Sequence, residues 1–212
     1  MAETRWEQAR ASERALGHGG YGAHFARLLD EGADIEGEAR LADALAPRGG
    51  WVLDAGSGMG RVGGSLVARG HRVVGVDFDP EVMEQSRRTY PDLPLVASRL
   101  DELTAEALSA AGFPTSYDLV VCVGNVMVLL APDTERTVLA TLGGLLAPGG
   151  RLLVGFAMSG APSEFSREYP LADFVADYEA VGLALEHRFA SYDLAPYVEG
   201  GTYAVHVLHR GA

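Results

Sequence analysis

The stretch Val52-Leu53-Asp54-Ala55-Gly56-Ser57-Gly58-Met59-Gly60 is the part of this sequence that best predicts its fold. An apolar strand leads into an acidic residue, three glycines follow at alternate positions, and a helical pattern begins at Arg61. Glycine is the residue used where backbone must turn sharply or approach a ligand closely. A glycine-rich turn between a strand and a helix places backbone N–H groups at the positive end of that helix. The stretch therefore predicts a strand–turn–helix unit that cradles a cofactor.

The composition indicates one soluble globular domain. The chain has 212 residues, of which 48% are hydrophobic and 22% charged, and its formal net charge is −12. That charge disfavours nucleic acid and anionic membrane surfaces as partners, because both attract basic patches. All 17 basic residues are arginine, which excludes lysine chemistry. We expect a monomer or homodimer with a small-molecule partner, no nucleic acid and no membrane.

The cysteine count and the apolar runs indicate the cellular compartment of the protein. The single cysteine, Cys122, cannot form an intrachain disulfide, which fits a reducing cytoplasm. The first residues lack the apolar core of a signal peptide. The most apolar run, residues 119–131, is interrupted by Gly124 and Asn125 and is too short to span a bilayer. We therefore expect a cytoplasmic protein.

Hydrophobic patterning predicts alternating strands and helices after a helical N-terminal segment, with its last helix ended by residues 47–50. Strands are expected at 51–54, 72–76, 95–97, 117–123 and 151–156, followed by a final pair at 183–194 and 201–210. Helices are expected at 3–16, 23–30, 36–46, 61–69, 80–90, 101–111, 133–146 and 171–181, and Pro148-Gly149-Gly150 is expected to end the helix at 133–146. Five apolar strands alternating with helices indicate an α/β fold with a doubly wound parallel sheet. The last two strands should pair as an antiparallel hairpin. One domain, 1–212, is expected, with 1–48 as a helical cap and 49–212 as the cofactor-binding core.

The ends of the predicted strands carry the candidate site, because ligands of open parallel sheets bind outside the carboxyl ends of the strands. The second strand ends at Asp77, whose carboxylate could accept hydrogen bonds from a ribose diol. A plainer interpretation is that Asp77 caps the helix beginning at Pro80. Asp79 suits that role better, because it directly precedes the proline.

Two cofactors are compatible with the glycines. Residues 58–63 satisfy the dinucleotide pattern G-x-G-x-x-G through Gly58, Gly60 and Gly63. That register is poor, because the first glycine should lie directly at the end of the strand. Asp77 also follows Gly63 by only fourteen residues. The register that fits is Asp54-x-Gly56-x-Gly58-x-Gly60.

In this register the chain resembles the class I S-adenosylmethionine-dependent methyltransferases. Their motifs recur in order over about residues 45–210, in the glycine turn and in the stretches Val73-Val74-Gly75-Val76-Asp77-Phe78-Asp79-Pro80, Tyr117-Asp118-Leu119-Val120-Val121-Cys122-Val123-Gly124-Asn125 and Leu145-Leu146-Ala147-Pro148-Gly149-Gly150-Arg151-Leu152-Leu153. The resemblance implies a Rossmann-like, three-layer fold with the strand order 3-2-1-4-5-7-6. It also implies S-adenosylmethionine (SAM) as cofactor and S-adenosylhomocysteine (SAH) as product.

The resemblance assigns roles to particular residues. Gly56, Ser57, Gly58 and Gly60 should line the methionine portion of the cofactor, and Asp54 should orient the turn and the cofactor amino group. Asp77 should bind the ribose hydroxyls, and Phe78 should lie against adenine. Ser98, Arg99 and Leu100 should flank the adenine edge; many relatives have an acidic residue where this chain has Arg99, so the backbone N–H of Leu100 is the expected contact. Val123, Gly124 and Asn125 should lie beside the sulfonium, and Tyr21 should cover the cofactor.

Catalytic residues leave a weaker signal. His18 and His24 flank Tyr21 and are candidates for a general base, although exposed histidines at helix ends are more common. Asn125 is a third candidate, and it could equally cap the next short helix. No histidine spacing predicts a metal site. Trp6, Trp51, Tyr192 and Tyr197 are interpreted as packing residues.

We therefore expect transfer of a methyl group to a small molecule by in-line displacement. Such a reaction depends mainly on holding the reactants in position, and a base is needed only when the acceptor is protonated. Residues 1–48, the loop 158–170 and the terminal hairpin should select the acceptor. Two alternatives stay open: an NAD(P)-dependent reductase that uses Gly58, Gly60 and Gly63, and a cofactor-binding regulatory protein without transferase activity.

Overall fold

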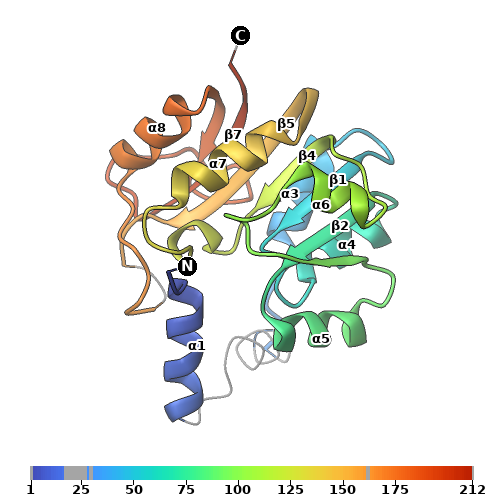
Figure 1. Ribbon diagram of the computed structural model, residues 1–212. Helices are drawn as coiled ribbons and strands as arrows, with labels where there is room; N and C mark the ends of the chain where they lie inside the picture. Colours follow the sequence, from blue (N-terminus) through green and yellow to red (C-terminus); the bar gives the residue numbers. More distant parts are fainter. Residues whose placement is uncertain (1, 17–27, 29–30, 161–162, 212) are drawn as a thin grey trace.

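The computed structural model of the protein describes residues 2–16, 28, 31–160 and 163–211. Its centre is a seven-stranded sheet with the order β3-β2-β1-β4-β5-β7-β6, which confirms the predicted topology (Figure 1). The strands are β1 (Trp51–Ala55), β2 (Arg72–Asp77), β3 (Leu95–Ala97), β4 (Tyr117–Cys122), β5 (Leu146–Ala157), β6 (Leu183–Phe189) and β7 (Tyr203–Arg210). Strands β1 to β5 pair in parallel, whereas β7 runs antiparallel between β5 and β6.

The helices that the structure describes occur where the apolar periodicity predicts them; the helix expected at 23–30 lies, apart from residue 28, outside the described residues. They are α1 (Arg5–Leu16), α3 (Gly37–Leu45), α4 (Arg61–Ala68), α5 (Pro80–Thr89), α6 (Ala105–Ala110), α7 (Glu135–Gly144) and α8 (Leu171–Ala180), with a short 3₁₀ helix η1 (Val126–Val128) after β4. The Asp79 carboxylate caps α5 by accepting from the backbone N–H of Glu81 at 2.9 Å. Thr104 caps α6, which therefore begins later than the predicted residue 101. Of the helices that the structure describes, none is long and apolar enough to cross a membrane.

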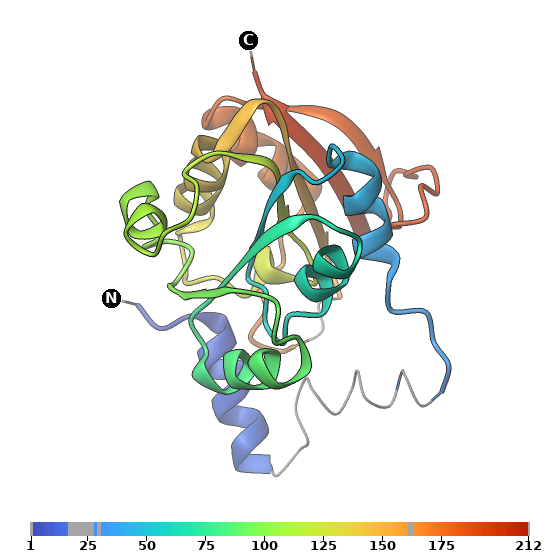
Figure 2. The same ribbon diagram turned by 90° about the vertical axis from the view of Figure 1, so that its right-hand side faces the viewer.

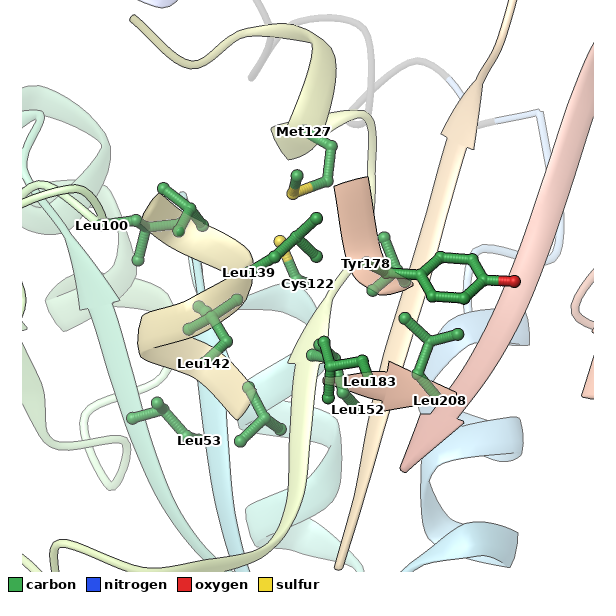
Figure 3. Close-up of a cluster of buried hydrophobic side chains, with 14 of the residues drawn as sticks. Leu53, Leu100, Cys122, Met127, Leu139, Leu142, Leu152, Tyr178, Leu183 and Leu208 are labelled. Atoms are coloured by element: carbon green, nitrogen blue, oxygen red, sulfur yellow. The ribbon is translucent and has the colours of Figure 1, made fainter. Parts of the chain in front are cut away.

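Helices cover both faces of the sheet, and each face has its own core. Because successive side chains of a strand point to opposite faces, Leu53 of β1 packs on one side and Val52 on the other. The first side is covered by α6, α7 and α8; Figure 3 shows Leu139 and Leu142 of α7 above Leu53 and Leu152 of the sheet. The second side is covered by α3 and α4.

Two further predicted boundaries were wrong. Pro148-Gly149-Gly150 does not lie between α7 and the strand but inside β5, where the register moves from Tyr117↔Leu146 to Leu119↔Arg151. The extra residues form a bulge, a feature that glycine with positive φ favours, and φ of Gly149 is +77°. Strand β6 ends at Phe189 rather than at 194, because residues 190–200 form a connection instead.

The architecture brings several segments to one edge of the sheet. Strands β1, β2 and β4 end there, and the antiparallel β7 begins there, with Tyr203 paired to Ala157. Helix α1 extends outward at this edge, beside the beginning of α5 (Figures 1 and 2). The edge therefore combines the glycine turn, the end of β4 and the N-terminal helix.

Candidate functional site

The glycine turn after β1 rests on the end of β2. The backbone N–H groups of Gly56 and Ser57 both donate to the carbonyl of Val76, at 2.8 and 3.0 Å. Gly56 has φ of +78°, and a Cβ there would lie 2.6 Å from a methyl group of Val126. A side chain at this position would therefore strain the backbone and collide with η1, so the close approach requires glycine.

Asp54 fixes the other end of the turn. Its carboxylate is buried and accepts from the backbone N–H of Gly63, in the first turn of α4, at 2.8 Å. Burial raises the pKa of Asp54 to about 7, and this hydrogen bond and Arg61 oppose the rise. Asp54 thus ties β1 to α4. Gly63 lies within α4, where its Cβ would meet Asp54 at 2.9 Å, so it is a packing position and not part of the turn.

Asp77 connects the end of β2 to the same turn. One carboxylate oxygen accepts from the backbone N–H of Gly58 at 2.8 Å, and the other accepts from Phe78 and Asp79 at 2.7 and 2.9 Å. Burial raises the pKa of Asp77, and these three backbone donors oppose the rise. A carboxylate has about four acceptor positions, so Asp77 retains capacity for a ligand hydroxyl.

A cavity of about 510 Å³ lies at this edge of the sheet. Most of the predicted binding residues that the structure describes line it: Gly56, Ser57, Gly58, Asp77, Phe78, Ser98, Arg99, Leu100, Val123, Gly124 and Asn125. Asp54 lines a smaller adjoining hollow of about 30 Å³, which shares Gly56, Ser57, Arg61, Val123 and Gly124 with the cavity. These twelve predicted residues therefore line one continuous site.

Gly60 lies behind the turn instead of lining the cavity. Its φ is +80°, and a Cβ there would lie 2.2 Å from Oγ of Ser86. The glycine is explained by the left-handed backbone before α4 and by close packing against α5.

The segment after β3 differs from the pattern of many relatives in an interpretable way. Arg99 donates two hydrogen bonds to the carboxylate of Asp101, at 2.9 and 2.8 Å, and this pairing lowers the pKa of Asp101. Both side chains line the cavity. The segment therefore presents a carboxylate to the cavity at Asp101, two residues after position 99.

Asn125 stabilises the end of β4. Its φ is +71°, and its side-chain oxygen accepts from the backbone N–H of Ala157, at the end of β5, at 2.8 Å. No side-chain bond caps η1, so Asn125 joins two strand ends instead. The other candidates, Tyr21, His18 and His24, lie outside the described residues. Within the described ranges, no group of three or more His, Cys, Asp or Glu residues could hold a metal ion.

Several cavity residues were not predicted. Thr4 lies just before α1, α1 contributes Trp6, Ala9 and Glu13, α3 contributes Glu38, and β7 contributes Tyr203. Trp6, interpreted from the sequence as a packing residue, lines the cavity and donates from Nε1 to Asp79 at 2.9 Å. Arg61 also lines the cavity and was not predicted. Its position in the sequence could have indicated this, because it directly follows the glycine turn and is the first residue of α4.

A family model described as a methyltransferase domain matches residues 52–150. The structure of a TehB-like SAM-dependent methyltransferase from Corynebacterium glutamicum is 37% identical to this chain with a TM-score of 0.79, and the match covers 90% of this chain and 96% of that protein. The chain belongs to the class I SAM-dependent methyltransferases.

Other methyltransferases support this result at different levels. An uncharacterized methyltransferase of Mycobacterium bovis is 39% identical over 115 residues, and the match covers 54% of this chain and 54% of that protein. The chain thus spans about half the length of the curated relative that it matches. A 1,6-didemethyltoxoflavin-N1-methyltransferase from Burkholderia thailandensis is 22% identical with a TM-score of 0.60, and the match covers 90% of this chain and 87% of that protein. That likeness concerns the methyltransferase fold alone.

Proposed function

We propose that this protein transfers a methyl group from SAM to a small-molecule acceptor, with residues 1–48 as a cap over the site. The observation that carries the proposal is the single cavity in which the glycine turn, Asp77, Phe78 and the end of β4 meet. We further propose that it acts in the cytoplasm as a monomer or homodimer, without nucleic acid or membrane partners, consistent with the net charge of −12.

The residues present fit a cationic nucleoside. Carboxylates outnumber guanidinium groups in the cavity lining, with Glu13, Glu38, Asp77 and Asp101 against Arg61 and Arg99. Asp77 is held by three backbone donors and is oriented to accept from ribose hydroxyls. Phe78 and Val82 supply apolar surface for a base, and Asp101 supplies an acceptor beside it.

The cofactor, when bound, supplies a methyl group on a positively charged sulfur with a good leaving group. The protein holds the reactants in position: the turn 56–58 would lie beside the methionine portion, Asp77 would hold the ribose, and Asn125 fixes the strand end next to which an acceptor would lie. Such positioning contributes about 7–11 kcal/mol in favourable cases, so the reaction needs no conspicuous catalytic pair. Thr4, together with Trp6 and Ala9 of α1, lines the cavity and would help to exclude water from it.

The size of the cavity supports a small acceptor. The cavity of about 510 Å³ lies within the range of about 300–1,000 Å³ for small-molecule sites, and the cofactor would share it, which leaves room for a small acceptor only. The Burkholderia protein that shares this fold is named a 1,6-didemethyltoxoflavin-N1-methyltransferase, and its structure contains 1,6-didemethyltoxoflavin and SAH. We therefore place the acceptor between the end of β4, η1 and α1, next to Asn125, Val126 and Leu129.

Calorimetric titration tests the cofactor assignment. The purified protein should bind SAH, and Asp77→Ala should weaken binding at least about tenfold, because a charge-assisted hydrogen bond and the anchoring of Gly58 are both lost. Asp173→Ala, which removes an exposed carboxylate on α8, is the matched control and should leave the affinity unchanged. Binding of NADH with no binding of SAM or SAH would instead favour a reductase.

Transfer of radiolabel tests the activity. We expect the protein with methyl-labelled SAM and a cell extract to label the low-molecular-mass fraction, and Asp77→Ala to abolish that labelling. Label found only in protein or nucleic acid would contradict a small-molecule acceptor. Tight SAH binding with no labelled product from any fraction would favour a regulatory protein.

A further inference from the structure

We propose that the methyl acceptor is an uncharged molecule with a polar group to which the hydroxyl of Tyr203 hydrogen-bonds. In this arrangement Tyr192 lies behind Tyr203 and holds its hydroxyl at the wall of the cavity. The inference rests on the proposed methyl transfer, and it adds the charge of the acceptor and a side chain that orients it.

The location of Tyr203 is the first argument. It begins β7, lines the cavity and pairs with Ala157 at the end of β5. The backbone N–H of Ala157 donates to the side chain of Asn125 at 2.8 Å, so Tyr203 and Asn125 adjoin the same residue. Strands β1, β4 and β5 separate β7 from β2, whose end carries the nucleoside contact Asp77. Tyr203 therefore faces the part of the cavity that the nucleoside leaves open.

The second argument is that another tyrosine holds the hydroxyl of Tyr203. Its oxygen lies 2.9 Å from that of Tyr192, and the two rings meet edge to face with centroids 6.2 Å apart. Burial raises the pKa of Tyr192, which keeps it protonated at neutral pH, and a hydrogen bond from the backbone of Gly124 opposes the rise. A Cβ on Gly155 of β5 would collide with the Tyr192 hydroxyl, so glycine makes room for it. A hydroxyl takes part in up to three hydrogen bonds, so this pairing is compatible with a bond from Tyr203 to a ligand.

The charge balance of the cavity is the third argument. Among the described residues, each charged side chain of the lining has a partner of opposite charge or backbone donors. The ion pairs are Arg10–Glu13, Arg61–Glu38 and Arg99–Asp101, with closest distances of 2.8, 2.6 and 2.8 Å, and Asp77 accepts from three backbone N–H groups. A charged acceptor would lose its hydration without gaining an unpaired counter-ion from these residues, which is unfavourable. An uncharged acceptor does not meet this penalty.

The wall around the proposed acceptor position is largely apolar. Its apolar side chains come from α1, from η1 and from the residues after η1: Ala9, Val126, Leu129, Leu130 and Ala131. The hydroxyl of Ser163 also lines the cavity but accepts from the N–H of Phe165 at 3.2 Å. That of Thr4 donates to Glu7 at 2.8 Å. Small-molecule sites combine apolar walls with a few placed polar groups that fix orientation, and Tyr203 supplies a group of this kind.

A purely structural role for the tyrosine pair explains less. The connection 190–200, which contains Tyr192, is fixed by other bonds: Ala190 donates to the carbonyl of Ala195 at 2.8 Å, and Arg40 binds Asp193 at 3.1 Å. Two phenylalanines would keep the edge-to-face contact of the rings. Packing alone therefore accounts for the rings, whereas a polar partner in the cavity also accounts for the hydroxyls.

The charge of the labelled product tests the charge of the acceptor. Product formed from methyl-labelled SAM and a cell extract, once separated from SAM, should pass unretained through both an anion exchanger and a cation exchanger at pH 7. Heat-inactivated protein is the control for label released by breakdown of SAM. Retention of the product by either resin would overturn the proposal. Absence of any labelled small molecule would instead contradict the proposed function, a distinct result.

Tyr203→Phe tests the contact. With limiting extract, the initial rate of labelling should fall about 3- to 10-fold, because one hydrogen bond between neutral groups is lost. The affinity for SAH, measured by calorimetry, should stay within about twofold of wild type, which shows that the variant is folded. Tyr192→Phe, which acts through Tyr203, should give a smaller loss that more extract reduces. A wild-type rate for Tyr203→Phe, or an equal loss of SAH affinity, would refute the contact.

Tyr197→Phe is the matched control. Tyr197 lies outside the cavity lining, in the same connection as Tyr192, and the guanidinium group of Arg188 lies 5.5 Å from the centroid of its ring. The loss of this hydroxyl should change neither the rate of labelling nor the affinity for SAH.

Phenol, benzoate and benzylamine give a readout that needs no natural acceptor. The three rings are similar in size and differ in charge. In the complex with SAH, ligand-observed NMR should show phenol binding at least about tenfold more tightly than either charged ring. Tyr203→Phe should weaken phenol about 3- to 10-fold. Phenol that binds no more tightly than benzoate or benzylamine would overturn the proposal.

Discussion

Buried polar groups occur in two regions of this protein, and the two regions use them differently. At the cavity, Asp54 and Asp77 accept hydrogen bonds from backbone N–H groups of the turn and its surroundings. Beneath α8, Tyr169 donates to the side chain of Asp177 at 2.6 Å, and His206 lies among aromatic rings. In the first region the backbone holds carboxylates toward a cavity; in the second, side chains bond and stack with one another.

We expect the cavity region to determine ligand affinity and the region beneath α8 to determine the free energy of unfolding. The region beneath α8 is an aromatic core, with ring centroids of Phe156 and Phe174 4.9 Å apart and those of Phe174 and His206 4.8 Å apart. Changes there should alter the free energy of unfolding and leave ligand affinity intact. Changes at the glycine turn should act mainly on affinity.

The largest effect is expected from Phe174→Ala. Phe174 is fully buried, so its loss should lower the free energy of unfolding by about 3–5 kcal/mol. Urea denaturation measures this change. The affinity for SAH, measured below the unfolding transition, should stay within about twofold of wild type. An affinity loss beyond that would show that the two regions are coupled.

Gly56→Ala, unlike Phe174→Ala, should reduce the affinity for SAH. The new Cβ would need to adopt the φ of +78° and would lie 2.6 Å from a Val126 methyl group, so the turn should shift. We expect SAH affinity to fall about 10- to 100-fold, with a loss of stability of about 1–3 kcal/mol. Gly112→Ala is the control: its φ is +85°, but nothing lies within 4 Å of the added Cβ. It should lose stability and keep its affinity.

Asp54→Asn tests the burial of a carboxylate at the site. The pKa of Asp54 is raised to about 7 in the folded protein, against about 3.9 when unfolded. The folded state therefore holds the proton more tightly, and this contribution to stability is full below pH 3.9 and is lost as the pH rises through about 7. Relative to Asp54→Asn, wild type should lose about 3 kcal/mol between pH 4.5 and 7.5. Urea denaturation at several pH values measures this difference, and a constant difference would contradict the raised pKa.

His206→Phe should have the smallest effect at neutral pH and the reverse pH dependence. Burial, aided by Arg188, lowers the pKa of His206 to about 3, below the unfolded value of about 6.5. The contribution of neutral His206 is present above pH 6.5 and is lost as the pH falls toward 3. The variant should match wild type within about 1 kcal/mol at pH 7 and exceed its stability at pH 4.5, as measured by urea denaturation. Wild-type stability equal to or above that of the variant at pH 4.5 would contradict this.

The alternation of five apolar strands with helices predicted the parallel sheet and most element positions, whereas the strand order was implied by the family resemblance. It failed at Pro148-Gly149-Gly150, where helix-breaking residues occupy a bulge inside β5. Proline and glycine mark an interruption of regular structure, and the pairing partner decides whether that interruption is a loop or a bulge.

The candidate site was predictable where it is local in sequence. The turn 54–60 and Asp77 follow directly from strand ends, and the family pattern adds Phe78 and Asn125. Trp6, Glu38 and Tyr203 were missed because they reach the cavity only through the packing of α1, α3 and β7. The identity of these residues alone does not predict that they reach the cavity.

The position of Trp6 gives the protein a built-in optical reporter. The chain has two tryptophans. Trp6 lines the cavity, whereas Trp51 begins β1 at the opposite end of that strand and lies beneath Arg72. Trp51→Phe would leave one indole, hydrogen-bonded to Asp79 beside the nucleoside contacts, so ligand arrival and departure could be followed in real time by fluorescence without any label.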